Sequence, residues 1–363
     1  MLIYLAKLSQ YFGPLRLFDY VTFRAGGALI FAFFIVVMLG APVARALRAW
    51  NAVSADRLAG LVPDEYIDKS KNKTPCMGGL LLIGGVIVSS LCWTRLDGVV
   101  APVFIGSTAL FALIGFGDDY IKTALHNRDG MSGKLKFGLT LAVAASALAI
   151  LRTSSGIGEV LDDLWVPLVK EPVYRGKLTW GVSLLAILGA VHGANLTDGK
   201  DGLATGCAIS CTLTYAVFAY MMSHKFFASY LNIPYIPGAE EAVVFAAAIC
   251  GACIGFLWHN CQPAAMFMGD TGSLPLGGAI GMLSVLTRQE VLLVLVAGVF
   301  VMEAGSVMLQ VFSVKAFNRR IFLCTPIHHH FERKNWTESQ IVIRFWILSW
   351  LFALLALSTL KLR

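Results

Sequence analysis

Residues 25–47 of the chain read AGGALIFAFFIVVMLGAPVARAL, a run that carries one charged side chain, Arg45. A helix that crosses a membrane needs about 20 mostly apolar residues, and this run meets that requirement. Nine further runs have the same character. The ten predicted spans are residues 25–47, 77–94, 99–117, 135–152, 178–194, 203–222, 242–259, 272–287, 291–314 and 341–360.

The composition of all 363 residues agrees with a membrane protein. Hydrophobic residues make up 57% of the chain and charged residues 14%, whereas soluble domains carry about 45–50% and about 25%. A soluble enzyme has no core large enough for this apolar excess, and a disordered chain would be more polar. We therefore predict an all-α, polytopic integral membrane protein that forms one domain over residues 1–363, with an amphipathic lead-in at residues 1–24.

The basic residues predict which side of the membrane each loop faces. The densest clusters, at residues 69–73 and 315–320, follow the first and the ninth span. Because Lys and Arg are retained on the cytoplasmic side, we place the loops after odd-numbered spans in the cytoplasm and both termini outside. Retention in the cytoplasm also accounts for the net charge of +7, so we predict no nucleic-acid partner.

The polar motifs gather in the same odd-numbered loops. They occupy residues 68–79, 115–122, 131–134, 195–203, 260–264, 267–273 and 325–332. The even-numbered loops 153–177 and 223–241 are typical of ordinary connectors. Polar clusters that all face one side of the membrane predict a single composite active site at the cytoplasmic interface.

Carboxylates, amides and lysines dominate these clusters. Asp118 and Asp119 are adjacent, Asp198 and Asp201 are three residues apart, and Asp270 precedes Thr-Gly-Ser. Oxygen ligands without thiolates favour Mg²⁺, which commonly bridges substrate phosphates. Lysines and Gly-rich turns suit the phosphate oxygens themselves. The pattern therefore predicts phosphoryl transfer at a magnesium site.

Each motif also has a purely structural interpretation. Asp270 could cap a helix, the Asp118–Asp119 pair could be a solvated helix end, and the histidines at 328–330 could be a surface tract. Glu303 is the one acid deep in a span, where acids mark functional sites, including those of secondary transporters. We favour an enzyme because the ionisable residues crowd one interface and the two halves of the chain do not match.

At these positions the sequence resembles the polyprenyl-phosphate N-acetylhexosamine-1-phosphate transferases. The resemblance runs from about residue 26 to the C-terminus and rests on five motifs: Thr74-Pro-Cys-Met-Gly-Gly79, Asp118-Asp-Tyr120, Asn195-Leu-Thr-Asp198 with Asp201-Gly-Leu203, Phe267-Met-Gly-Asp-Thr-Gly-Ser273, and Pro326-Ile-His-His-His-Phe-Glu332. The last motif indicates the branch that transfers phospho-N-acetylmuramoyl-pentapeptide. The branch that transfers N-acetylglucosamine-1-phosphate to the same lipid stays open as the alternative.

The resemblance implies a multi-pass enzyme of peptidoglycan biosynthesis in the bacterial inner membrane. Its substrates would be UDP-N-acetylmuramoyl-pentapeptide and undecaprenyl phosphate, a lipid of the bilayer. Its products would be lipid I and UMP, and its cofactor would be Mg²⁺. The sequence is silent on the oligomeric state, for which a homodimer is one option.

The resemblance also implies roles for individual residues. Asp118, Asp119, Asp270 and His328 would form the catalytic set, with Asp270 as the metal ligand and Asp118 as the base that deprotonates the lipid phosphate. Phe267 would stack on uracil. The remaining substrate-binding residues would be Lys71, Lys122, Lys134, Asn195, Asp198, Asp201, Asn260, Gln310 and His329. Of these, Lys71 and Gln310 would reach the uridine. The chain departs from the family pattern at Asp68, Lys73 and Lys200, and these departures bear on the role of Lys71.

Overall fold

The computed structural model describes residues 2–50, 52, 74–125, 127 and 129–361. In this part of the chain nearly all regular structure is helical, and the two strands form one short antiparallel pair. The helices that build the bundle are α1 (Val21–Ala49), α2 (Gly79–Trp93), α3 (Val100–Thr123), α4 (Gly133–Thr153), α6 (Leu178–Thr197), α7 (Leu203–Ser223), α9 (Ala239–Asn260), α10 (Asp270–Leu286), α12 (Gly298–Phe317) and α14 (Glu338–Ser358). The all-α prediction is confirmed.

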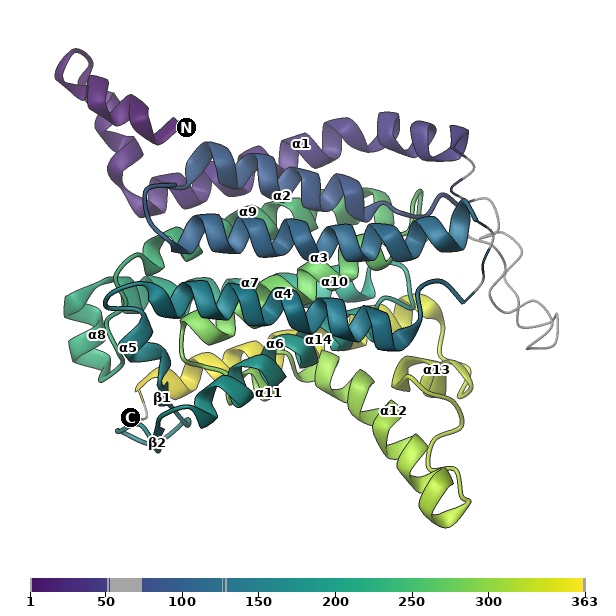
Figure 1. The fold of residues 1–363 in the computed structure, drawn as a ribbon. Helices are drawn as coiled ribbons and strands as arrows, with labels where there is room; N and C mark the ends of the chain where they lie inside the picture. The colour runs from purple at the N-terminus through teal and green to yellow at the C-terminus, as the bar shows by residue number, and fades with distance from the viewer. Residues whose placement is uncertain (1, 51, 53–73, 126, 128, 362–363) are drawn as a thin grey trace.

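The remaining elements are short. They are the 3-10 helices η1 (Leu2–Gln10), η2 (Gly13–Asp19) and η5 (Thr359–Lys361), the helices α5 (Gly158–Leu161), α8 (Lys225–Leu231), α11 (Leu293–Val296) and α13 (Ile327–Glu332), and the strands β1 (Asp163–Leu164) and β2 (Tyr174–Arg175). The predicted lead-in at 1–24 contains η1 and η2, which project from one end of the bundle (Figure 1).

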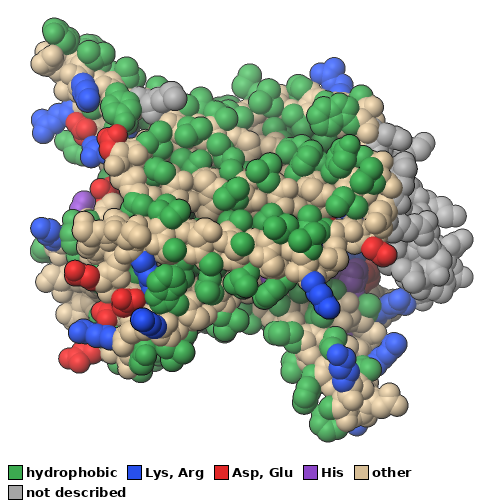
Figure 2. All heavy atoms as spheres, in the orientation of Figure 1, with side chains coloured by type: hydrophobic (Ala, Val, Ile, Leu, Met, Phe, Trp, Pro, Cys, Tyr) green, Lys and Arg blue, Asp and Glu red, His purple; other side chains and the backbone are tan. Residues whose placement is uncertain are grey.

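Each of the ten predicted spans contains a helix. Eight helices in the described residues are long and apolar enough to cross a membrane, namely α1, α3, α4, α6, α7, α9, α12 and α14. The other two, α2 and α10, have 15 and 17 residues. Figure 2 shows apolar side chains over the middle of the bundle and charged side chains at its two ends, the pattern expected of a protein embedded in a bilayer.

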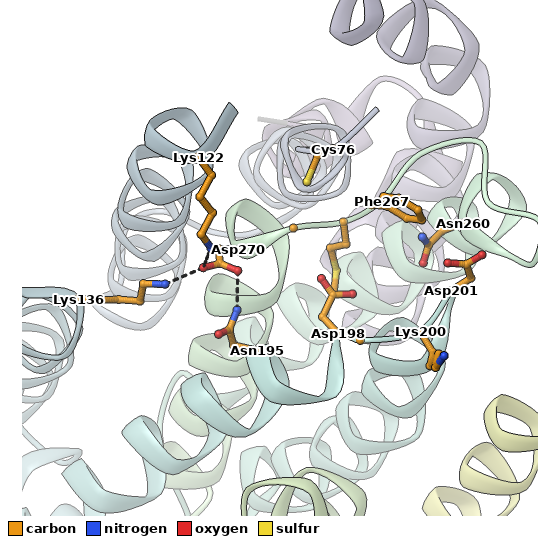
Figure 3. Close-up of a pocket in the computed structure, with 13 residues that line it drawn as sticks. Cys76, Lys122, Lys136, Asn195, Asp198, Lys200, Asp201, Asn260, Phe267 and Asp270 are labelled. Carbon is orange, nitrogen blue, oxygen red and sulfur yellow. Dashed lines mark hydrogen bonds and ion pairs between the residues drawn. The ribbon is translucent and has the colours of Figure 1, made fainter. Parts of the chain in front are cut away.

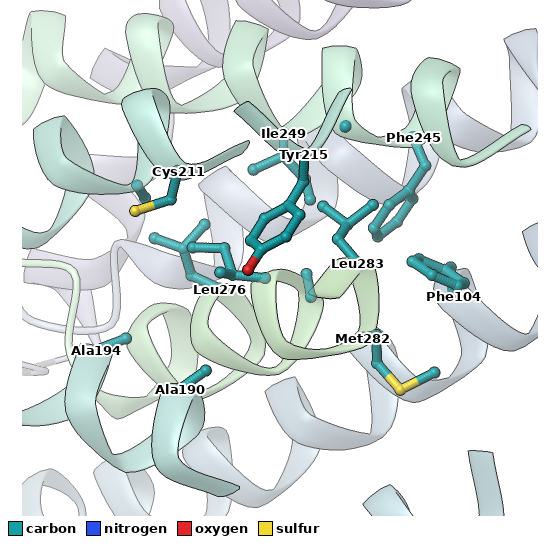
Figure 4. Close-up of a cluster of buried hydrophobic side chains, with 14 of the residues drawn as sticks. Phe104, Ala190, Ala194, Cys211, Tyr215, Phe245, Ile249, Leu276, Met282 and Leu283 are labelled. Carbon is teal, nitrogen blue, oxygen red and sulfur yellow. The ribbon is translucent and has the colours of Figure 1, made fainter. Parts of the chain in front are cut away.

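The central helix of the bundle is α10, in which every residue is buried. Its glycines allow this, because a Cβ at Gly281 would lie 2.6 Å from the Cα of Ile187 on α6, and only a helix without that atom can pack so closely. Apolar side chains from α3, α7 and α9 close around it (Figure 4), among them Phe104, Tyr215 and Phe245. The central position of α10 fixes where its first residue, Asp270, can lie.

The ninth predicted span is not one helix. The chain breaks at Ala297 into α11 and α12, and α12 then runs away from the bundle, as Figure 1 shows. Both ends of the described chain lie at the end of the bundle opposite α13 in Figure 1, as expected if both termini share one side of the membrane.

Candidate active site

The polar loops meet at the end of the bundle that carries α13, and side chains from most of them line one cavity of about 300 Å³ (Figure 3). Its lining residues are Cys76, Lys122, Lys136, Asn195, Asp198, Gly199, Lys200, Asp201, Asn260, Phe267, Met268, Gly269 and Asp270. Seven of the predicted site residues are in this set, contributed by segments that lie almost 150 positions apart in the chain. The prediction that these loops build one composite site agrees with this arrangement.

Asp270 is the charged centre of the cavity. Its Oδ2 accepts hydrogen bonds from Lys136 Nζ at 2.7 Å and from Lys122 Nζ at 3.1 Å, and its Oδ1 accepts one from Asn195 Nδ2 at 2.8 Å. The preceding residue, Gly269, has φ of 73° and ψ of 179°, a conformation that is essentially restricted to glycine. The helix-cap interpretation of Asp270 is therefore wrong, because Gly269 takes the cap position and the Asp270 side chain is directed at cations.

Asp118 lies directly behind Asp270, in the last turns of α3. It is fully buried, and it forms ion pairs with Lys122, one helical turn later, and with Lys136 at 2.9 Å. The backbone N–H of Met131 also donates to Asp118 at 2.7 Å. The two lysines thus bridge Asp118 and Asp270. The Asp118–Asp119 pair is buried, so it is not a solvated helix end.

Asp119 points to a different partner from that of Asp118. Its Oδ2 accepts hydrogen bonds from the backbone N–H and the hydroxyl of Thr271, at 2.8 and 2.7 Å. Its Oδ1 is buried and has no hydrogen-bond partner among the described residues. Carboxylate oxygens of Asp118, Asp119 and Asp270 all lie within 4.8 Å of one another. Three hard oxygen donors, one of them unsatisfied, fit a divalent cation such as Mg²⁺.

The second lysine of the cavity is Lys136, whereas the sequence motif suggested Lys134. Helix α4 begins at Gly133, after Ser132 accepts a hydrogen bond from the Leu135 N–H. Two residues span about 200° around a helix, so Lys134 and Lys136 face nearly opposite directions. Lys134 is exposed, and Lys136 reaches both carboxylates. Lys136, and not Lys134, is therefore the lysine of α4 that lines the cavity.

The other end of the cavity carries an aromatic ring and amide groups (Figure 3). Phe267 lies on a segment that pairs with the first loop, since its N–H donates to the Pro75 carbonyl and its carbonyl accepts from the Gly78 N–H, both at 2.8 Å. Asn260 is buried and accepts from the Gly202 N–H at 2.9 Å, and Asp201 accepts from the Ala264 N–H at 3.3 Å. These bonds hold the 198–202 loop beside Phe267.

The histidine motif lies against the back of this loop. His329 Nδ1 donates to Glu332 at 2.8 Å, and Lys200 Nζ donates to the same carboxylate at 2.6 Å. The His329 hydrogen bond and the Lys200 ammonium lower the pKa of Glu332 to about 2, so this carboxylate is ionised at neutral pH. This bond ties the Lys200 side chain to α13, although Lys200 also lines the cavity. His328 is buried and its Nδ1 donates to Glu303 at 3.0 Å.

Gln310, one of the two residues expected to reach the uridine, does not line the described cavity. The Gln310 amide binds backbone groups of the following loop, donating to the Phe322 carbonyl at 3.1 Å and accepting from the Phe322 N–H at 2.9 Å. It lines a separate surface pocket with Lys315 and Arg320. Lys71 lies outside the described residues, as do Asp68 and Lys73.

The comparisons with known proteins agree with this geometry. Residues 101–288, which include the clustered aspartates Asp118, Asp119 and Asp270 and both bridging lysines, match glycosyl transferase family 4. Two phospho-N-acetylmuramoyl-pentapeptide transferases, from Methylacidiphilum infernorum and from Ruegeria pomeroyi, are each 42% identical to this chain. Both alignments cover 100% of this chain and 100% of the relative.

Proposed function

Because the chain belongs to glycosyl transferase family 4, and within it to the phospho-N-acetylmuramoyl-pentapeptide transferases, we propose that UDP-N-acetylmuramoyl-pentapeptide and undecaprenyl phosphate react in the cavity at Asp270. The protein is a multi-pass membrane transferase of peptidoglycan biosynthesis, and in bacteria such an enzyme lies in the inner membrane. The observation that carries the proposal is the buried set of three carboxylates and two bridging lysines at the end of an apolar bundle.

The reaction exchanges one P–O bond for another. An oxygen of the lipid phosphate attacks the sugar-linked phosphorus of the UDP-sugar, the diphosphate bond breaks, and UMP leaves with its phosphate. The products are UMP and lipid I, in which a new diphosphate joins the sugar to the carrier. Positioning and charge stabilisation supply most of the catalysis in such transfers.

Residues at different places in the cavity carry out different parts of the reaction. Lys122 and Lys136 hold phosphate oxygens, since their ammonium groups already reach the carboxylates at the charged end. Asp118 takes the proton of the lipid phosphate. Phe267, at the other end, stacks on the uracil ring, and the 198–202 loop lies between the two ends, where the diphosphate would pass.

Mg²⁺ is the cofactor that fits the donor set. Asp270 and Asp119 would hold it, the latter through its unpaired buried oxygen, with Asp118 close behind. A bound magnesium ion would neutralise charge on the phosphates. The three aspartates together carry one more negative charge than the two lysines offset, and this balance favours a cation.

The activity is tested by giving the purified protein Mg²⁺, undecaprenyl phosphate and either UDP-N-acetylmuramoyl-pentapeptide or UDP-N-acetylglucosamine, and by measuring UMP release. We expect UMP only with the pentapeptide substrate. Release only with UDP-N-acetylglucosamine would assign the chain to the other branch. Solute flux into liposomes without any lipid product would overturn the enzyme in favour of a transporter.

A further inference from the structure

Glu303 and His328 form a buried pair behind the cavity. Glu303 lies on α12 and is fully buried, while His328 lies on α13 with 1% of its surface exposed. His328 Nδ1 donates to Glu303 Oε2 at 3.0 Å, and the backbone N–H of His328 points at the same oxygen, 3.5 Å away. The carboxylate therefore fixes both the orientation of the ring and the start of α13.

A contribution to stability alone does not explain why these two ionisable groups are buried. Removing two ionisable groups from water costs several kcal/mol per ion unless their remaining donors and acceptors are satisfied. Glu303 Oε1 and His328 Nε2 are buried, and neither has a hydrogen-bond partner among the described residues. A buried ionisable pair with unsatisfied atoms beside a cavity is a candidate for function.

The unsatisfied nitrogen faces the cavity loop. A Cβ placed on Gly199 would collide with His328 Nε2, so the ring lies directly against the Gly199 backbone. Gly199 lines the cavity between Asp198 and Lys200. The chain of contacts thus runs from Glu303 through the imidazole to the loop at the middle of the cavity, where the diphosphate would lie.

On the basis of the proposed function, we propose that Glu303 is a positioning residue for phosphoryl transfer. By accepting the Nδ1–H of His328, it directs Nε2 of that ring toward the Gly199 loop and the substrate diphosphate. A carboxylate that orients an imidazole through Nδ1 is a recurrent arrangement in hydrolases and metal sites. Glu303 itself touches no substrate and acts only through His328.

The test is a double-mutant cycle in the full-length protein with Mg²⁺, using UMP release as the readout. We expect Glu303→Gln to lower kcat about 10- to 100-fold, the usual cost of losing an orienting partner. The KM for the UDP-sugar should stay within about twofold, because the uracil end is untouched. In the His328→Ala background the same substitution should cost less than twofold, since two residues that act as one unit are not additive.

Two further variants keep the test decisive if Glu303→Gln unfolds. Glu303→Asp keeps the charge and should restore part of kcat. Glu241→Gln is the matched control, because Glu241 is also a buried acid, paired with Arg24 at 2.7 Å far from the cavity, and it should lower the thermal midpoint without changing kcat.

The inference is overturned if Glu303→Gln keeps wild-type kcat, if its cost is the same with and without His328, or if activity falls only in step with the folded fraction. Absence of UMP release by the wild-type protein with either UDP-sugar would instead overturn the proposed function and the positioning role with it.

Discussion

The most informative single perturbation is Lys136→Met, because the structure and the sequence motif disagree on which lysine enters the site. Met is unbranched like Lys and only one atom shorter, and it removes the charge. Lys136 Nζ lies 2.7 Å from Asp270 and 2.9 Å from Asp118, so the substitution leaves two buried carboxylates with Lys122 as their remaining ion-pair partner. Lys134→Met, two residues earlier on the same helix and exposed, is the matched control.

The size of the effect follows from the number of charge-assisted bonds that are lost. A hydrogen bond to a charged group contributes about 1.5–3 kcal/mol. One such bond from Lys136 to a phosphate oxygen in the transition state corresponds to roughly a 10- to 150-fold loss of kcat/KM. The magnesium concentration for half-maximal activity should not rise, because removing a cation beside three carboxylates strengthens their attraction for Mg²⁺.

The assay is UMP release at varied UDP-sugar and magnesium concentrations, with the thermal midpoint measured in parallel. We expect a large loss of kcat/KM for Lys136→Met and less than a twofold change for Lys134→Met. The reasoning is refuted if the two variants exchange these results, or if Lys136→Met needs more Mg²⁺ and recovers fully once it is supplied.

Three other predictions use the same preparation. Phe267→Ala should raise the KM for the UDP-sugar by roughly 5- to 150-fold, the 1–3 kcal/mol that stacking on a base contributes, and a fall in kcat at unchanged KM would exclude stacking on uracil. Chelation with EDTA should stop UMP release, and added Mg²⁺ should restore it. Asp119→Asn should raise the half-saturating Mg²⁺ concentration at least about tenfold. An unchanged Mg²⁺ dependence of this variant would remove Asp119 from the metal site. Gly115→Ala should destabilise the fold by about 1–3 kcal/mol, the usual cost of overpacking, because its Cβ would collide with the backbone of Asp270. Gly106→Ala on the same helix is the control, since a Cβ there faces open space. Equal thermal midpoints for the two variants would contradict the packing argument.

The sequence predicted the helices well because each helix must be apolar, although its surroundings differ from one helix to another. Most must face lipid, and α10 must face other helices on every side. The apolar runs therefore mark where helices occur, although they do not distinguish a lipid-facing helix from a buried one. The break at Ala297 was not predicted, although Gly298 follows it directly. A single glycine in an apolar run does not distinguish a break from close packing between helices, and Gly298 does pack against Phe352.

The site was predicted to the level of its loops and less well to the level of its side chains. Counting the spans shows which loops lie on the same side of the membrane, so the convergence of distant motifs could be predicted. The choice between Lys134 and Lys136 depends on helical phase, which Ser132 sets by capping α4. No periodicity in the short 131–134 motif shows where that helix begins. The motif therefore pointed to Lys134, whereas Lys136 is the lysine that lines the cavity.

Gln310 shows the limit of carrying a role over by position. Its amide satisfies three backbone hydrogen bonds of the 321–322 segment, a demand created by the path of the loop after α12 and invisible in a motif. Glu303 shows the opposite case. The sequence marked this acid as a candidate functional residue because it lies in a span, but its partner could be named only once α13 was placed against α12.

The distribution of buried charge argues for chemistry at an interface and against ion transport. Two other buried ion pairs, Arg24–Glu241 and Arg288–Glu290, lie at the end of the bundle opposite the cavity. Neither pair lines any part of the cavity. A transporter would need ionisable groups near the middle of the bundle, on helices of two matching halves. Glu303 lies within α12, and it is bonded to a histidine that faces the cavity loop. If it coupled an ion to transport, Glu303→Gln would abolish flux and leave UMP release intact, whereas a residue that orients His328 must change kcat.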